Sequence, residues 1–196
     1  MGKTRGFTLV ELAIVLVIIG IILGAILKGT ELINNAKVKR LQNDLKGLEA
    51  AIWTFYDRTG RMPGDCNNNG TIDYQLGSTA PTLSSTTTAP GSLCNGTEDQ
   101  DAPFNDLRYA RILPQNAANA EIAKHPFNGI FAIGSNGTAN AIAIYNVPAW
   151  AAKMIDRSID GSENGTAGRI RRLDNAADWP GDQDQAVAII YYFDRM

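Results

Sequence analysis

Residues 6–27 read GFTLVELAIVLVIIGIILGAIL, and this stretch decides the fold. A helix rises about 1.5 Å per residue, so the apolar run over 7–27 is long enough to cross about 30 Å of hydrocarbon. Glu11 is the only charged residue in the run. Lys3 and Arg5 precede it, and the positive-inside rule therefore keeps the N-terminus in the cytoplasm and sends the rest of the chain outward. We predict a transmembrane helix over 7–27.

The apolar run differs from an ordinary secretory signal, which has a shorter core followed by a small-residue cleavage site. Residues 28–31 read KGTE and contain no such site. An uncut signal anchor is the alternative. It would place the Glu11 carboxylate in a membrane. The free-energy cost of inserting such a charge is roughly 2.5–3.5 kcal/mol near the centre of the bilayer and less toward an end of the helix. The leader, residues 1–6, offers Glu11 no partner in the right place.

Residues 6–12, GFTLVEL, resemble the processing signature of type IV prepilins and of type II secretion pseudopilins. The resemblance implies that residues 1–6 are a leader, which a membrane-embedded prepilin peptidase removes by cutting between Gly6 and Phe7 before the new N-terminus is methylated. It also implies assembly through Phe7 and Glu11. The cationic amine of Phe7 can pair with the Glu11 carboxylate of a neighbouring subunit in a stack of parallel helices.

Gly20 and Gly24 are spaced so that another helix can approach closely, as in small-xxx-small pairs. Glycine also loosens a helix locally. Both roles are open from the sequence.

The helical pattern continues over residues 28–60 with an amphipathic character. A one-sided apolar stripe recurs at spacings of four, three, four and three, and consists of Leu41, Leu45, Leu48, Ile52 and Phe55. Gly60 and the following Pro63-Gly64 end the helix. We expect the stripe to pack on a sheet of the same chain, with a partner-binding groove as the alternative.

Residues 61–196 are expected to form a globular head, so that the whole fold is α+β: a long N-terminal helix packed on an antiparallel β-sheet, as the pilin resemblance also implies. Residues 61–124 are predicted to be rich in loops, with one short helix at most. The sheet is predicted within 126–196, with strands at 127–134, 140–147, 168–173 and 186–193, a hairpin turn at 135–138 and a short helix at 148–155.

Cys66 and Cys94 are the only cysteines. On an exported head they are expected to form a disulfide across the least regular stretch. A cysteine nucleophile with His125 as its base is the alternative, but no known catalytic signature surrounds either cysteine.

Residues 65–73 read DCNNNGTID and match the first nine positions of an EF-hand-like calcium loop. The candidate ligands are Asp65, Asn67, Asn69, the Thr71 carbonyl and Asp73. The loop departs from the motif at Leu76, where an EF-hand has its bidentate Glu. Glu98, Asp99 or Asp101 would have to supply that ligand. A turn without an ion is the alternative.

Two further acidic clusters, Asp156 with Asp160 and Glu163, and Asp182 with Asp184, are weaker candidates for cation sites and are expected to be solvated loops or helix caps. The only basic run contains Arg169, Arg171 and Arg172. On a strand the first two would share one face, and we expect an edge that is solvated or forms salt bridges between subunits rather than a nucleic-acid patch.

The functional hypothesis is a structural subunit and not an enzyme. The formal net charge of −2 and a single His disfavour nucleic-acid binding and most His-dependent catalysis. The resemblance implies an inner-membrane precursor that polymerises with copies of itself into a surface filament. Its partners would be the prepilin peptidase, a platform membrane protein and an assembly ATPase. Calcium is the one expected cofactor. The alternatives are a periplasmic pseudopilin or minor pilin, and less plausibly a membrane-anchored enzyme or receptor.

Overall fold

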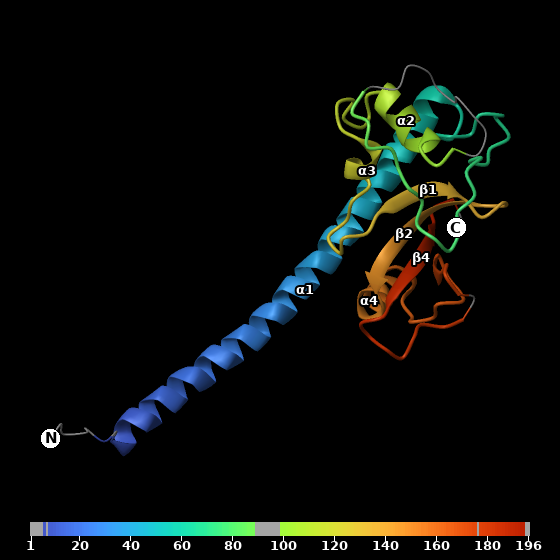
Figure 1. The fold of residues 1–196 in the computed structure, drawn as a ribbon. Coiled ribbons are helices and arrows are strands. Elements are labelled where there is room, and N and C mark those ends of the chain that lie inside the picture. The colour runs from blue at the N-terminus through green and yellow to red at the C-terminus, as the bar shows by residue number, and fades with distance from the viewer. Residues whose placement is uncertain (1–5, 7, 89–98, 176, 195–196) are drawn as a thin grey trace. The chain divides into compact units, whose positions relative to one another are not determined.

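The computed structural model describes residues 6, 8–88, 99–175 and 177–194. Figure 1 shows the order of its helices and strands. They are α1 (Leu9–Thr59), α2 (Ala102–Tyr109), α3 (Asn119–Ile122), β1 (Phe131–Ser135), β2 (Asn140–Pro148), α4 (Ala149–Asp160), β3 (Ile170–Arg172) and β4 (Ala186–Tyr192). All pairings in the four-stranded sheet are antiparallel, in the order β1-β2-β4-β3. The predicted α+β class is confirmed.

The chain divides into two compact units, Met1–Lys39 and Arg40–Met196. In the first unit α1 begins at Leu9 and continues without a break through the predicted span. Its large apolar side chains are exposed on every side of the helix, from Leu9 to Ile33. A helix that is apolar all round requires an apolar environment, either lipid or other helices.

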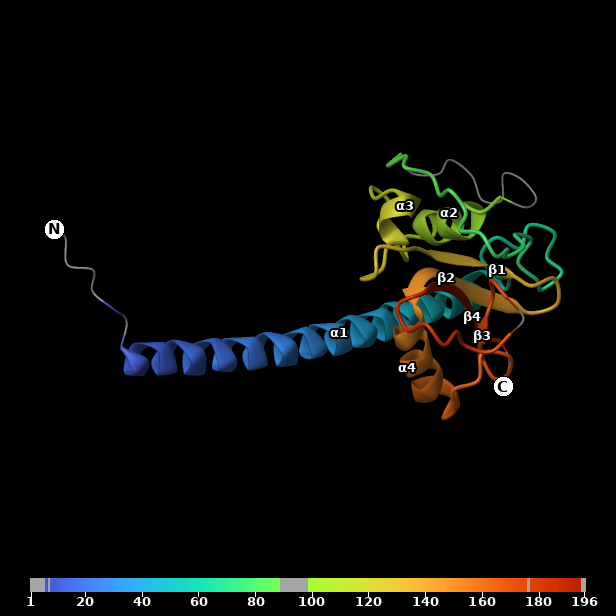
Figure 2. The same cartoon turned by 60° about the horizontal axis from the view of Figure 1, so that its bottom comes forward.

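In the second unit, the apolar stripe of α1 is buried as predicted. Leu41, Leu45, Ile52 and Phe55 are fully buried, and Leu48 is 8% exposed. Figure 2 shows this part of α1 beside the sheet, with α2 and α3 near β1 and α4 near the β3–β4 side.

Both faces of the sheet are covered because successive side chains of each strand point to opposite sides. On β4, Tyr191 contacts side chains of α1, while its neighbours Ile190 and Tyr192 belong to a core cluster on the other face. That cluster includes Leu76. The segment that contains Leu76 lies beside β1, and the Leu76 N–H donates to Ser135 O at 2.8 Å. The strands are therefore mostly apolar on both faces.

The prediction of one short helix at most in residues 61–124 was wrong, because the structure has two there, α2 and α3. The boundaries of β1 and α4 also differ from the prediction. β1 begins at Phe131 rather than 127, because Asn128 has φ 58° in a turn closed by its N–H to His125 O at 3.1 Å. α4 runs five residues beyond 155 and ends at Gly161, which has φ 76° and donates its N–H to Arg157 O. A left-handed glycine is a common helix terminator. The hairpin turn is as predicted, with Gly137 at φ 90° and an Asn136 N–H to Ala139 O bond.

Gly129 lies where backbone from β2 passes closely. A Cβ built on it would lie 1.9 Å from Tyr145 O and 2.5 Å from His125 Nε2. We predict that Gly129→Ala destabilises the head by about 3 kcal/mol or more, since the backbone cannot give way. Tryptophan fluorescence during denaturant unfolding in detergent is a suitable measurement, because all three tryptophans lie in the Arg40–Met196 unit.

Gly47→Ala is the matched control for this prediction. A Cβ at Gly47 would meet no atom within 4 Å. Alanine in a helix interior is more stable than glycine by about 0.5–1 kcal/mol, so this variant should be neutral or more stable than the parent. Equal stability of the two variants would contradict the close approach at Gly129.

Candidate functional site

Thr8 and Glu11 close the first turn of α1. The Thr8 N–H and hydroxyl both donate to Glu11 Oε2 at 2.8 Å, and the Glu11 N–H donates to Thr8 Oγ1 at 3.3 Å. Reciprocal bonds of this kind form a capping box, which satisfies backbone donors at a helix start. Residues 1–6 were predicted to hold no partner for Glu11 in the right place. The partner is Thr8, and the Thr-x-x-Glu spacing ahead of an apolar run was the signal for it.

The other predicted groups of this region are only partly described. Gly6 is exposed, whereas Phe7 lies outside the described residues, so the structure places one side of the predicted cleavage bond. Within the described residues, α1 is the one helix long and apolar enough to cross a membrane, and its most apolar window has no buried residue.

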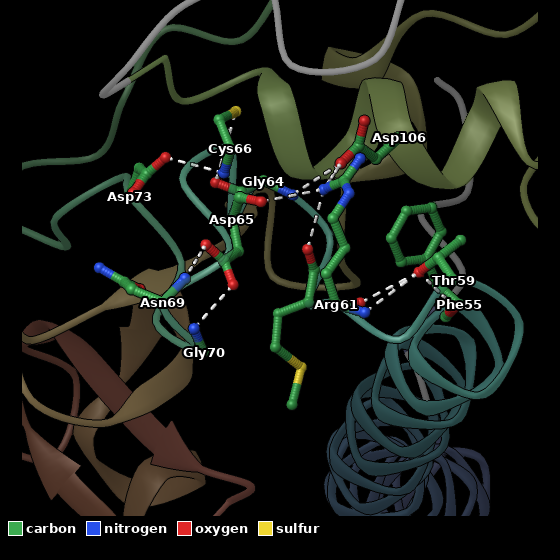
Figure 3. A network of polar contacts seen from close by, with 11 residues as sticks. Phe55, Thr59, Arg61, Gly64, Asp65, Cys66, Asn69, Gly70, Asp73 and Asp106 are labelled. Atoms are coloured by element: carbon green, nitrogen blue, oxygen red, sulfur yellow. Dashed lines mark hydrogen bonds and ion pairs between the residues drawn. The ribbon is translucent and has the colours of Figure 1, made fainter.

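Asp65 is the centre of the loop predicted to bind calcium (Figure 3). Its side chain is fully buried. Oδ1 accepts the Asn69 N–H at 3.1 Å and Oδ2 accepts the Gly70 N–H at 2.9 Å. Gly70 has φ 87°, which allows the sharp turn. The Asp65 carboxylate therefore organises the loop through its own backbone.

The remaining candidate ligands are held in the same way. Asn67 Oδ1 accepts the Asn69 N–H and Asn69 Oδ1 accepts the Thr71 N–H, at 3.0 and 2.8 Å. Asp73 accepts the Cys66 N–H at 2.9 Å and the Asn67 Nδ2 amide at 2.6 Å. The loop thus closes through hydrogen bonds among its own groups, and calcium binding stays a prediction.

The twelfth position of the calcium motif has no substitute carboxylate in the described residues. Leu76 is buried in the core cluster. The Asp101 carboxylate accepts the Ser84 N–H at 2.9 Å, Asp99 Oδ1 accepts the Asp101 N–H at 2.9 Å, and Glu98 lies outside the described residues. No group of three or more His, Cys, Asp or Glu in the described part of the chain is arranged to hold a metal.

Asp106 joins this loop to α2 and was not foreseen from the sequence. Its buried Oδ2 accepts the Gly64 N–H at 2.8 Å and the Arg61 Nη1 at 2.7 Å (Figure 3). Gly64 has φ 79°, and a Cβ there would lie 2.7 Å from Pro103 Cγ. The tripeptide Pro63-Gly64-Asp65 is therefore a junction between the end of α1, the loop and α2.

Cys66 follows directly and is not a free thiol. Its predicted partner, Cys94, lies outside the described residues, and the Cys66–Cys94 pairing stays a prediction. His125 does not serve as a base for Cys66. Its Nδ1 accepts the Phe127 N–H at 3.3 Å, and its Nε2 lies 2.8 Å from Tyr145 O. Burial lowers the pKa of His125.

Asp65→Ala should destabilise the head even in a chelator. Two backbone N–H groups would lose their acceptor, and the expected loss is about 2–3 kcal/mol. Asn67→Ala, at an exposed position of the same loop, is the control and should lose less than about 1 kcal/mol. Denaturant unfolding with calcium and with chelator measures both quantities. An effect of Asp65→Ala confined to calcium would contradict this assignment and indicate an ion-dependent loop.

Asp156, predicted as part of a weak cation site, is instead a buried acceptor on α4. Its Oδ2 accepts the Trp179 Nε1 at 2.8 Å and the Asn164 N–H at 2.7 Å. Its Oδ1 has no hydrogen-bond partner among the described residues. Burial and, to a smaller extent, the neighbouring Asp160 raise the pKa of Asp156 to about 6, against the lowering effect of the two hydrogen bonds. The carboxyl fastens the 161–179 segment to α4.

We predict that Asp156 makes the head more stable in mild acid. Its folded pKa, about 6, lies above the ordinary value of 3.8. The contribution of Asp156 to the free energy of unfolding is therefore complete below pH 3.8. About 1–3 kcal/mol of it is lost as the pH rises through about 6. Asp156→Asn keeps an acceptor for Trp179 and does not titrate. The change in unfolding free energy between pH 4.5 and 7.5 should therefore differ between the two proteins, and identical profiles would contradict the assignment.

The basic run differs from the prediction. The Arg169 guanidinium lies over the Tyr191 ring and that of Arg171 over the Tyr192 ring. Tyr191 and Tyr192 are successive residues of β4 and face opposite sides of the sheet, so the two arginines do not share a face. Arg169 precedes β3 and does not follow the alternation of that strand. Arg172 forms a salt bridge with Asp174 of the same chain at 2.9 Å, and pairing between subunits stays a prediction.

Comparison with known proteins identifies the N-terminal segment. Residues 1–27 match the prokaryotic N-terminal methylation motif. The match ends within α1 and does not extend to the head. No curated protein matches the sequence.

Among solved structures, the major type IV pilin PilA1 from Clostridium difficile is similar at 13% sequence identity. The alignment covers 82% of this chain and 96% of that chain, with a TM-score of 0.42. We draw no functional conclusion from a similarity at this level. The chain is thus an α+β protein whose long first helix begins in an N-terminal methylation motif.

Proposed function

We propose that this protein is a structural subunit of a type IV pilus-like surface filament. It would be processed between Gly6 and Phe7 and polymerised through its N-terminal helix. One observation carries the proposal: the methylation motif at residues 1–27 runs directly into α1, whose first half exposes apolar side chains on all sides. Such a helix is stable in lipid before assembly, and packed among copies of itself afterwards.

Glu11 supports assembly in register. Among the described residues of the single subunit its carboxylate bonds to Thr8, which has no charge to pair with it. Cleavage before Phe7 would create an ammonium group close to the helix start. A charge-assisted hydrogen bond from one subunit's amine to the next subunit's Glu11 would neutralise both charges away from water. Apolar contacts would supply the area, and this pair would fix the axial position.

Gly20 and Gly24 support close packing. A Cβ on either glycine would meet no atom within 4 Å, and α1 is unbroken through both. No contact inside the subunit therefore requires glycine at these positions, which favours close approach of a neighbouring helix over local loosening.

The implied partners follow from this assembly route. They are the prepilin peptidase, a platform membrane protein and a cytoplasmic assembly ATPase, acting on a precursor in the inner membrane. The head is proposed to have no catalytic role, because the hydrogen bonds of Asp65, Asp106 and His125 hold backbone and loop groups rather than facing a shared cleft.

Mass spectrometry of the N-terminal peptide tests the proposal, on material sheared from cells and on washed membranes. A peptide that begins at methylated Phe7 in the sheared fraction is the expected result. The same peptide confined to membranes would indicate a pseudopilin or minor subunit instead. An intact leader, residues 1–6, in both fractions would refute processing.

Glu11→Gln should insert into the membrane normally but lower the filament yield about tenfold or more. The amide keeps an acceptor for Thr8 and removes only the charge, so a loss would be attributable to pairing between subunits. Glu31→Gln is the matched control, since Glu31 pairs with Lys28 at 2.7 Å in its own helix. Immunoblots of sheared and membrane fractions measure both steps. Normal yield from Glu11→Gln would reduce the role of Glu11 to helix capping.

A further inference from the structure

A polar pocket of about 400 Å³ lies in the head, between α1, the last turns of α4 and the residue before β3. None of the features proposed above for processing or assembly involves it. It is lined by Gln42, Asn43, Lys46, Ser158, Ile159 and Arg169.

The two cations of the pocket are held in place by Tyr191, which is fully buried. Lys46 Nζ and Arg169 Nη2 both donate to the Tyr191 hydroxyl, at 2.6 and 2.8 Å. Arg169 Nε also donates to Tyr192 O at 3.0 Å. Each cation lies 4.9 Å from the centre of the Tyr191 ring. The positive groups are therefore ordered before any ligand arrives, which lowers the entropic cost of binding.

The charge of this arrangement is not balanced. Among the described residues Glu49 is the one carboxylate that contacts both cations, 2.8 Å from Lys46 Nζ and 3.6 Å from Arg169 Nη2. Burial lowers the pKa of Lys46, but its hydrogen bonds to Glu49 and Tyr191 outweigh that effect and the pKa is raised. Lys46, Arg169 and Glu49 together thus have one positive charge in excess, while the nearby Asp160 carboxylate accepts the Ile170 N–H at 2.8 Å and forms no ion pair with either cation in the described structure.

The pocket also presents unused donors. The side chains of Gln42, Asn43 and Ser158 make no hydrogen bond within the described structure, and Arg169 Nη1 makes none either. Ordered cations with amide, hydroxyl and guanidinium donors are the usual means of recognising carboxylate, sulfate or phosphate oxygens.

We infer that this pocket is an oxyanion-binding site, in which Lys46 and Arg169 hold a carboxylate- or sulfate-type group and Ser158 donates to it from α4. The group comes either from a free ion or from an acidic side chain of a second copy. Asp57 and Glu121 are exposed carboxylates without an ion pair in the described structure. The inference does not depend on filament formation.

Nuclear magnetic resonance of the full chain in detergent micelles tests the site, with the Arg169 Nε–H signal as the reporter. Sodium sulfate is titrated against sodium chloride at equal ionic strength. We expect a saturable shift of this signal. Ser158→Asp, which places a carboxylate at the exposed rim without touching the Tyr191 network, should weaken sulfate binding about tenfold or more. Arg171→Gln, two residues from Arg169, is the matched control and should bind as the parent does.

Two results would overturn the inference. One is a shift of the Arg169 signal that does not saturate, and the other is the same sulfate affinity in Ser158→Asp as in the parent. Tryptophan fluorescence melts would first establish that Ser158→Asp is folded. Repeating the measurement over a range of protein concentrations without sulfate separates the sources. An Arg169 shift that grows with protein concentration and is reversed by sulfate assigns the group to a second copy, whereas a response to sulfate alone assigns it to a free ion.

Discussion

Leu41, Leu45, Ile52 and Phe55 are withdrawn from water along one side of α1, and the rest of the head is arranged around that contact. Burial of each such side chain contributes about 1.5–3 kcal/mol. The contact also determines where polar side chains of α1 lie. Because the stripe fixes α1 on the sheet, Lys46 and Glu49 reach the Tyr191 hydroxyl, and the polar pocket exists only as a product of this packing.

A single helix serves two environments in this chain. Between Leu9 and Ile33 the apolar side chains surround α1, whereas from residue 40 onward they are confined to one stripe. The backbone is satisfied internally in both parts, and therefore the same secondary structure is compatible with lipid, with neighbouring helices and with a sheet. What differs is only the distribution of side chains around the axis. Membrane insertion and head folding are thus encoded separately within one element.

The sequence predicts the parts of this fold that depend on local periodicity. The stripe of α1, the strands β2 and β4 and the Asn136-Gly137 turn all follow from spacings within a few residues. The buried acids do not. Asp106 reaches Gly64 across 42 positions, and Asp156 reaches Trp179 across 23. Nothing near Asp106 or Asp156 in the sequence distinguishes a buried acceptor from a solvated acid.

The candidate site shows the same division. The methylation motif is a linear pattern and was recognised in full, and the glycine at position 70 turns the loop as the calcium motif requires. The sequence could not show that the Asp65 oxygens already accept two backbone N–H groups. The Thr8–Glu11 capping box, in contrast, follows from the Thr-x-x-Glu spacing alone.

The position of β4 has a consequence for biogenesis. This strand is the last element in chain order, yet it lies in the middle of the sheet, between β2 and β3, and supplies Tyr191 to the contact with α1. Until β4 is available to pair with β2, β1 and β2 form only a hairpin, which is marginal by itself. The head therefore cannot fold progressively as it emerges. More than a hundred residues between α1 and β4 therefore lack their completed sheet until the last strand is available, a stage at which chaperones or proteases have access to them.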